Sequence, residues 1–257
     1  MRLASCRRAL KCGVLFALIA LSGCKGKALF RSEHDTVVFV LFDVSGSTNS
    51  ALVRQSYIRD LDPIRQLLSR DGGTLRGDVI GSEALNTSTI PLDVTFPSYN
   101  PIFSTEKKHD EQVRKASALL DKQLEGALEN TPAASRSAIM SSLEVAGKIL
   151  NGDQMRGASR KILVVVSDMV EESPRYRFPR EALTEARIRS IVEAERSNGR
   201  LPNLQGVTVW KTGASAVDLN DDQSRALQAF WIQYFRAAGA NLQPDHYGSA
   251  LLNFPVD

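Results

Sequence analysis

Three stretches of the chain are apolar without the alternation of a half-exposed strand. They are Thr36–Phe42, Lys161–Val166 and the shorter Gly206–Trp210. β-Branched and aromatic residues are frequent in all three, which favours strands, and continuous apolarity is typical of strands that are covered on both faces. We therefore predict three central strands of a mostly parallel sheet.

Four other stretches carry apolar residues every three or four positions, the spacing of an amphipathic helix. They cover 53–68, 113–127, 139–150 and 227–238. The last is the clearest, because Asn220 can cap its start and Gly239 can end it. Its predicted buried stripe consists of Leu227, Phe230, Trp231, Tyr234 and Ala238.

Two shorter strands are predicted near 74–80 and 88–96, joined by a turn around 83–86, and they form a hairpin at one edge. A further edge strand is predicted at 247–254. Strands that alternate with helices indicate the α/β class. The expected fold is a doubly wound, mostly parallel six-stranded sheet with an antiparallel edge strand and helices on both faces, as in Rossmann-like proteins.

The first 23 residues have the features of a signal peptide. A basic stretch ends at Lys11, an apolar run covers 12–21, and small residues follow. This apolar run is too short to span a bilayer. Leu21-Ser22-Gly23-Cys24 resembles the lipobox of bacterial lipoproteins, which implies cleavage before Cys24 and lipidation of its thiol. In this family, an Asp directly after the lipidated cysteine favours retention in the inner membrane. This chain has Lys25 at that position, so the resemblance favours an anchor in the outer membrane that faces the periplasm. We expect a signal peptide at 1–23, a lipidated tether at 24–35 and one domain at 36–257.

Composition agrees with this division of the chain. The 257 residues are 24% charged and 43% hydrophobic, which excludes a disordered tail, a collagen-like rod and a multi-span membrane protein. The formal charge is +3, but residues 1–23 hold four basic residues and no acidic one. The remainder carries 28 basic and 29 acidic residues, a net charge of −1, so the charge does not indicate a nucleic-acid partner.

The three cysteines all lie in or next to the predicted signal peptide. Cys6 and Cys12 would be removed with it, and lipid would occupy Cys24. The mature domain then has no thiol for a disulfide, a nucleophile, an iron–sulfur cluster or a cysteine zinc site.

The first strand ends in Asp43-Val44-Ser45-Gly46-Ser47, which places one carboxylate and two hydroxyls in a single turn. Open α/β sheets bind ligands at the carboxyl ends of their strands. Small oxygen ligands suit a hard cation such as Mg²⁺. A plain helix cap with turn residues is the alternative interpretation of this stretch.

This motif resembles the metal-ion-dependent adhesion site of von Willebrand factor A (VWA) domains, and the order of elements agrees over 36–254. The resemblance implies a further hydroxyl from a later loop and an Asp after the fourth strand. Asp168 supplies the latter, and Ser137 is expected where the family has Thr, with Thr131 and Ser135 as fallbacks. The cation would be Mg²⁺, or else Mn²⁺ or Ca²⁺.

The resemblance further implies a non-enzymatic function. The cation would keep one coordination position open for an Asp or Glu of a partner protein in the cell envelope. Glu171, Glu172 and Arg175 either line that partner surface or are plain solvated loop residues. Two other functions remain open: a metal-dependent hydrolase or phosphatase with an aspartate nucleophile, and a VWA scaffold with a degenerate metal site. The phosphatase needs a second carboxylate two residues after Asp43, where the chain has Ser45.

Overall fold

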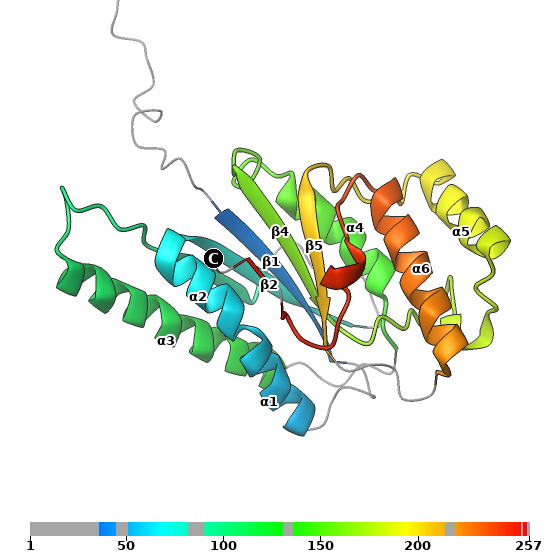
Figure 1. Cartoon of the computed structure of the whole chain (residues 1–257), viewed down its shortest axis with the longest axis horizontal. Coiled ribbons are helices and arrows are strands. Elements are labelled where there is room, and N and C mark those ends of the chain that lie inside the picture. Colours follow the sequence, from blue (N-terminus) through cyan, green and yellow to red (C-terminus); the bar gives the residue numbers. More distant parts are fainter. Residues whose placement is uncertain are drawn as a thin grey trace, which may run out of the picture. The chain divides into compact units, whose positions relative to one another are not determined.

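The computed structural model describes residues 36–44, 51–81, 90–130, 136–213, 219–252 and 254–255. These residues form a sheet with helices packed on it (Figure 1). The strands are β1 Thr36–Asp43, β2 Gly73–Ile80, β3 Leu92–Phe96, β4 Arg160–Val166 and β5 Val207–Thr212. The α-helices are α1 Ala51–Asp60, α2 Asp62–Asp71, α3 Glu106–Asn130, α4 Ile139–Leu150, α5 Glu185–Ser197 and α6 Asp221–Ala237. Short 3₁₀ helices cover Phe178–Arg180 and Pro244–His246.

The sheet has the strand order β3-β2-β1-β4-β5. β2, β1, β4 and β5 run parallel to one another, and the edge strand β3 pairs with β2 in the antiparallel direction. The predictions of a mostly parallel α/β sheet and of an antiparallel strand pair at its edge are thus confirmed, whereas the predicted turn around 83–86 lies outside the described residues. Strand order reverses at β1, which lies between β2 and β4. Open α/β sheets bind ligands at the carboxyl ends of the strands that flank such a switch point.

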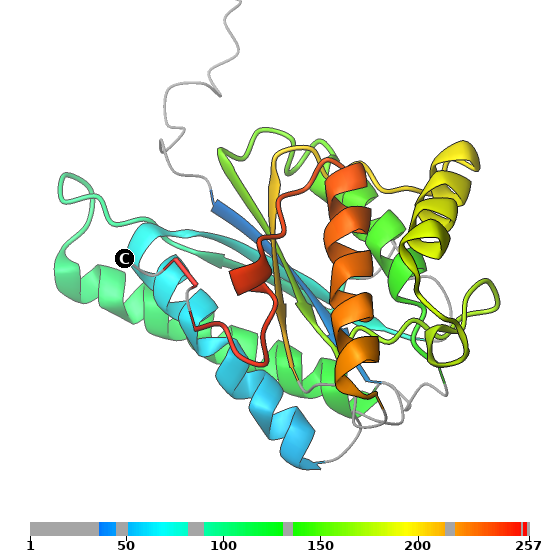
Figure 2. The ribbon, with the colours of Figure 1, turned by 45° about the vertical axis from the view of Figure 1, so that its right-hand side comes forward.

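β1 is buried over its whole length because helices cover both faces of the sheet. Phe39 and Leu41 belong to an apolar layer with α4, α5 and α6. Val40 and Phe42 belong to a second layer with α1, α2 and α3. Figures 1 and 2 show these two groups of helices on opposite faces. The continuous apolar pattern of β1 follows from this double burial.

The sixth strand predicted at 247–254 is wrong for the residues that the structure describes. Beyond α6, the chain runs along β5 and makes only two isolated bridges, Asn241 with Thr208 and Tyr247 with Lys211. Between them lies the 3₁₀ helix that begins at Pro244. Pro244 has no N–H to donate to a strand ladder, which interrupts pairing before Tyr247. Tyr247 then bridges to the next-to-last residue of β5, so the predicted strand at 247–254 would run past the end of β5.

The helix predicted at 53–68 is two helices. α1 ends at Asp60 and α2 begins at Asp62, with Pro63 in its first turn. Proline is tolerated in the first turn of a helix but disrupts the interior of one. Pro63 therefore explains why the segment is divided into α1 and α2, a break that the apolar spacing does not reveal.

The prediction for the last helix is confirmed. The side chain of Asn220 accepts a hydrogen bond from the backbone N–H of Gln223, and the side-chain carbonyl of Gln223 accepts one from the backbone N–H of Asn220. Gly239 follows the helix with a φ of +83°, the conformation for which glycine is favoured. The whole predicted stripe of α6 is buried. None of the helices in the described ranges is long and apolar enough to cross a membrane.

Candidate metal site at the carboxyl edge of the sheet

Asp43 is the last residue of β1, and it lies at the switch point of the sheet. Phe42 pairs with Val166, the last residue of β4, so Asp43 and Ser167 follow side by side on neighbouring strands. Asp43 is completely buried although it carries a carboxylate. A buried carboxylate needs hydrogen-bond donors or a cation to compensate for lost hydration.

Hydroxyl groups surround Asp43. The Ser137 hydroxyl lies 3.1 Å from each of its carboxylate oxygens, and the Ser167 hydroxyl donates to Oδ2 at 2.7 Å. The Tyr57 hydroxyl donates to the backbone carbonyl of Asp43 at 2.7 Å. Ser137 and Ser167 are themselves buried. Three segments that lie far apart in the sequence therefore meet at this carboxylate.

Asp168 lies one residue beyond Ser167 and is partly exposed. Its Oδ1 accepts the backbone N–H of Val170 at 2.9 Å, and the Ser167 hydroxyl accepts the N–H of Met169. Met169 has a φ of +65°, which is rare for a residue other than glycine. The turn after β4 is therefore held by side chains in a strained backbone conformation, a feature that often accompanies functional sites.

Glu171 connects this turn to the segment that carries Ser137. It is completely buried, and Oε2 accepts the N–H of Met140 at the start of α4 at 2.9 Å. Glu172 donates its backbone N–H to the carbonyl of Ser137. Burial raises the pKa of Glu171 to about 7. The predictions of a partner surface or a solvated loop are thus wrong for Glu171, which instead caps a helix from outside.

Arg175 and Glu195 fix the far end of the same loop. Glu195 in α5 is completely buried, and Oε2 lies 2.6 Å from an Arg175 nitrogen. The Tyr176 hydroxyl and the Arg200 guanidinium donate to the other side of this carboxylate. Arg175 also donates to Ser141 in α4. Arg175 is therefore a structural residue of the loop rather than a freely solvated one.

Lys211, the next-to-last residue of β5, brings a cation to this edge of the sheet. It is buried, its ammonium donates to the carbonyl of Gly213 at 3.1 Å, and it lies 5.3 Å from the centroid of the Tyr247 ring. Burial lowers its pKa to about 8, and the negative charges of Asp168 and Asp60 act in the opposite direction. Sequence reasoning missed Lys211, since a lone polar residue at a strand end carries no distinctive pattern.

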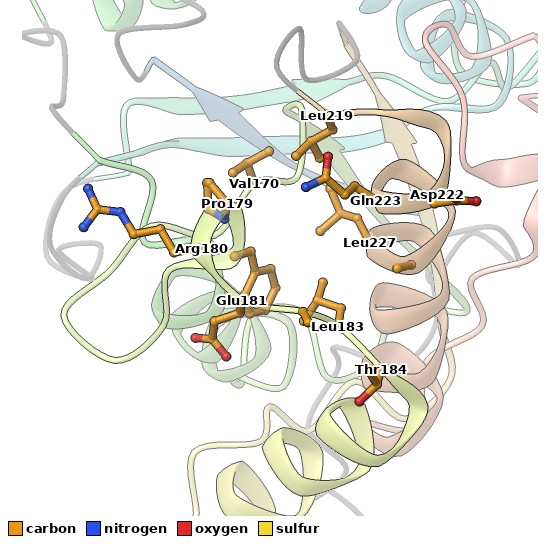
Figure 3. A pocket seen from close by; sticks show the side chains of 13 residues that line it. Val170, Pro179, Arg180, Glu181, Leu183, Thr184, Leu219, Asp222, Gln223 and Leu227 are labelled. Atoms are coloured by element: carbon orange, nitrogen blue, oxygen red, sulfur yellow. The ribbon is translucent and has the colours of Figure 1, made fainter.

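A pocket of about 410 Å³ opens beside the turn after β4. Figure 3 shows it between the segment around Pro179–Thr184 and the start of α6. Val170, Leu219 and Leu227 contribute apolar surface, whereas the Arg180 side chain points away from α6. Sequence reasoning did not find this pocket, because two segments about 40 residues apart form it.

The oxygen ligands fit a hard cation better than a soft one. Asp43, Ser137 and Asp168 offer carboxylate and hydroxyl oxygens, the ligand type that Mg²⁺ and Ca²⁺ prefer. Among the described residues, no three His, Cys, Asp or Glu side chains form a group that could hold a metal ion. The candidate site contains two side chains of these types, Asp43 and Asp168. Serine hydroxyls would therefore have to supply the remaining protein ligands of the cation.

The structure thus brings Ser137 to Asp43 and places Asp168 just after the neighbouring strand. Ser45, Ser47 and Cys24 lie outside the described residues, as do the fallbacks Thr131 and Ser135. Ser167 was not predicted as a site residue, although it directly precedes Asp168 at a strand end.

Comparison with known proteins finds structural similarity, at low sequence identity in the three examples that follow. No family model and no curated protein sequence matches the chain. Similar solved structures include the manganese-loaded TRAP protein of Plasmodium vivax (TM-score 0.40, covering 76% of this chain and 63% of that one). They also include the pilus adhesin SpaC of Lactobacillus rhamnosus GG (TM-score 0.43, 84% and 28%) and proximal thread matrix protein 1 of the mussel byssus (0.36, 78% and 41%).

Each of the three is 14% identical to this chain, and the chain spans less than two thirds of each. TM-scores at this level carry no argument about function. The class of the protein therefore rests on its own fold and site: an open α/β sheet with an oxygen-rich cluster at its switch point.

Proposed function

We propose that this protein is a non-enzymatic binding module of the VWA type, in which a divalent cation connects the domain to a partner protein. Asp43, Ser45, Ser47, Ser137 and Asp168 would hold the cation, with Mg²⁺ as the first candidate and Mn²⁺ or Ca²⁺ as alternatives. A carboxylate of the partner would complete the coordination.

The observation that carries this proposal is the cluster of Asp43, Ser137 and Ser167 at the switch point of the sheet. The hydroxyls of the two serines hold the buried carboxylate in one orientation. With only two carboxylates, a divalent cation would keep much of its positive charge. Such a cation attracts an incoming Asp or Glu strongly.

The anchor is a further part of the proposal. Lipidation at Cys24 would fix the domain to a bacterial envelope membrane, and the resemblance of 21–25 favours the periplasmic face of an outer membrane. The partner would then be another envelope protein. Fatty-acid labelling tests this part by itself, since incorporation should disappear in Cys24→Ala.

Lys211 favours one alternative, a VWA scaffold with a degenerate site. A buried ammonium whose charge acts on Asp168 could compensate that carboxylate without a metal ion. In that case the chain would bind its partner through the same edge of the sheet, but independently of divalent cations. The hydrolase alternative has no comparable observation in its favour.

Metal titration of the chain from residue 24 onward decides between these functions. We expect saturable binding of Mg²⁺ or Mn²⁺ by calorimetry, and its loss in Asp43→Asn and Asp168→Asn. Asp121→Asn is the matched control, because Asp121 forms an exposed ion pair with Arg65 on α2. Wild-type protein that binds no divalent cation would refute the adhesion site and leave the degenerate scaffold.

Partner capture completes the test. A crosslinked pull-down from the native envelope, with and without chelator, should lose the same proteins after chelation and in Asp43→Asn. A set of captured proteins that changes neither after chelation nor in Asp43→Asn would contradict the metal bridge. Phosphatase or esterase turnover that disappears in Asp43→Asn would instead establish the enzyme.

A further inference from the structure

The loop between β3 and α3, residues 97–105, exposes large apolar side chains. Ile102 is 83% and Phe103 70% exposed, and Tyr99 is 46% exposed. None of the nine residues 97–105 is charged. We call this segment the β3–α3 loop. Large apolar side chains that gather at one exposed tip commonly mark a contact surface.

Hydrogen bonds and packing give the β3–α3 loop a defined shape. Asn100 accepts the backbone N–H of Phe103 and of Ser104 with its carbonyl, and that of Ile102 with its side chain. At the base of the loop, Tyr99 packs against the ring of His109, with centroids 5.2 Å apart. Ile102 and Phe103 are therefore exposed on an ordered turn.

The base of the loop is also joined to the turn between α2 and β2. The Ser98 hydroxyl donates to the carbonyl of Asp71 at 3.3 Å. The backbone of Ser98 lies so close to Gly72 that a Cβ on Gly72 would be 2.8 Å from the Ser98 nitrogen. The position of the tip is thus fixed relative to the sheet.

Sheet register places this loop at the edge where the described chain begins. Val37 pairs with Thr74, and Thr74 pairs with Thr95. Two strand spacings separate Val37 from Thr95, so the start of β1 and the end of β3 lie about 10 Å apart. Figures 1 and 2 show both on the side of the domain away from the carboxyl ends of the strands. In the sequence, the predicted tether 24–35 directly precedes Thr36, the first residue of β1.

We propose that the β3–α3 loop inserts Ile102 and Phe103 into the surface of the membrane to which the chain is anchored. The proposal rests on anchoring near Cys24, which belongs to the proposed function. An uncharged tip with Tyr, Ile and Phe suits the boundary between headgroups and acyl chains, where aromatic side chains are enriched.

This contact would fix the orientation of the domain relative to the membrane. Asp43 lies seven residues along β1 from Thr36, which is about 23 Å at the usual rise of a strand. A domain that is held by its tether and by the tip at one edge would direct Asp43 and Asp168 away from the membrane. The candidate site would then face the partner rather than the lipid.

The test attaches the chain to vesicles without relying on cellular acylation. The chain from residue 24 onward has Cys24 as its only cysteine, and all described elements lie within it. Its Cys24 thiol is coupled to a maleimide lipid in phosphatidylcholine vesicles that contain acyl-chain-brominated lipid. Phe103→Trp serves as the probe, and Ile58→Trp on α1 serves as the matched control, since Ile58 is also exposed.

We expect bromine to quench the added fluorescence of Phe103→Trp several-fold more than that of Ile58→Trp. Equal quenching of the two would overturn the proposal. A second probe is Tyr99→Trp in the vesicle-bound chain. Adding Ile102→Ser/Phe103→Ser should make iodide quenching of this probe several-fold stronger, and adding Ile58→Ser should not. An unchanged accessibility in the double variant would also refute the contact.

Neither readout depends on the candidate metal site, so chelator should leave both unchanged. A failed metal titration with normal quenching would refute only the metal bridge. Absent quenching with normal metal binding would refute only the membrane contact. If the double variant instead changes the oligomeric state in solution, the tip joins two copies of the chain and the membrane proposal is wrong.

Discussion

The hydroxyl of Ser137 lies 3.1 Å from both carboxylate oxygens of Asp43, although 94 residues separate the two in the sequence. Both side chains are buried, so this contact supplies a donor to a charge that has lost its hydration. It also joins the segment before α4 to the end of β1. The contact is therefore structural as well as a part of the candidate metal site.

Ser137→Ala should destabilise the domain and weaken divalent-cation binding. The Asp43 carboxylate would keep the Ser167 hydroxyl but lose that of Ser137, which costs about 1–3 kcal/mol of the free energy of unfolding. Urea denaturation and calorimetric titration measure the two effects. Ser142→Ala is the matched control, because Ser142 is buried in the next turn and donates only to the carbonyl of Ala138. Equal metal affinity in both variants would contradict a role for Ser137.

Glu171→Gln should stabilise the metal-free domain at pH 8 and have little effect near pH 4.5. Burial raises the pKa of Glu171 to about 7, so the folded state holds a proton that the unfolded chain has already released. Stability therefore falls as the pH rises from about 4.5 to 7, and the wild type loses about 3 kcal/mol across this window. Gln keeps an acceptor for Met140 without the charge. Denaturation curves from pH 4.5 to 8 should be flatter for the variant, and parallel curves would disprove the assignment.

Lys211→Met should increase the affinity for Mg²⁺ or Mn²⁺ at pH 7. The ammonium of Lys211 acts on Asp168, so a bound cation and this charge repel each other. Removing it should tighten binding roughly tenfold, which corresponds to about 1.4 kcal/mol. Since burial lowers the pKa of Lys211 to about 8, wild-type affinity should also rise between pH 7 and 9. Weaker binding in the variant would show that Lys211 holds Asp168 in position instead.

Glu195→Gln should destabilise the domain by about 3 kcal/mol. The change leaves Arg175 and Arg200 without the buried carboxylate that they share, and breaking a buried ion pair is costly. Glu185→Gln is the control, because the exposed pair of Glu185 with Arg189 contributes about 0.5 kcal/mol at most. Thermal and urea unfolding measure the difference. A similar small loss in both variants would mean that the loop after β4 does not depend on Glu195.

Gly72→Ala should disturb the base of the β3–α3 loop. Gly72 has a φ of +75°, and a Cβ there would lie 2.8 Å from the Cα of Ser98. The strain should cost about 2 kcal/mol or more, since backbone strain adds to the clash. Gly199→Ala separates the two causes, because Gly199 has a φ of +67° with no atom within 4 Å of the added Cβ. A loss in Gly72→Ala no larger than that in Gly199→Ala would rule out the contact with Ser98.

The helices and strands of this protein follow largely from local pattern. Continuous apolar runs predicted β1 and β4 because double burial removes polar residues from both faces of a strand. Asn220 and Gly239 marked the ends of α6 because capping depends on neighbouring residues only. The break between α1 and α2 was missed, since the apolar spacing continues across Pro63.

The predicted sixth strand shows a limit of local pattern. Residues 247–254 have strand-like composition, but pairing depends on whether an open edge and backbone donors are available together. Tyr247 bridges to Lys211, one residue before the end of β5, so the residues after Tyr247 have almost none of β5 left to pair with. The two isolated bridges of this segment to β5 are visible in the folded structure and not in the sequence.

The sequence by itself determined the α/β class, the antiparallel edge and the strand-end positions of Asp43 and Asp168, because these depend on periodicity and on turn residues. The tertiary structure alone decided that Ser137 and Ser167 contact Asp43, that Glu171 caps α4 and that Lys211 is buried beside this edge. Hydrogen bonds between segments about 90 to 120 residues apart depend on how the sheet aligns its strands, and no local pattern records that alignment.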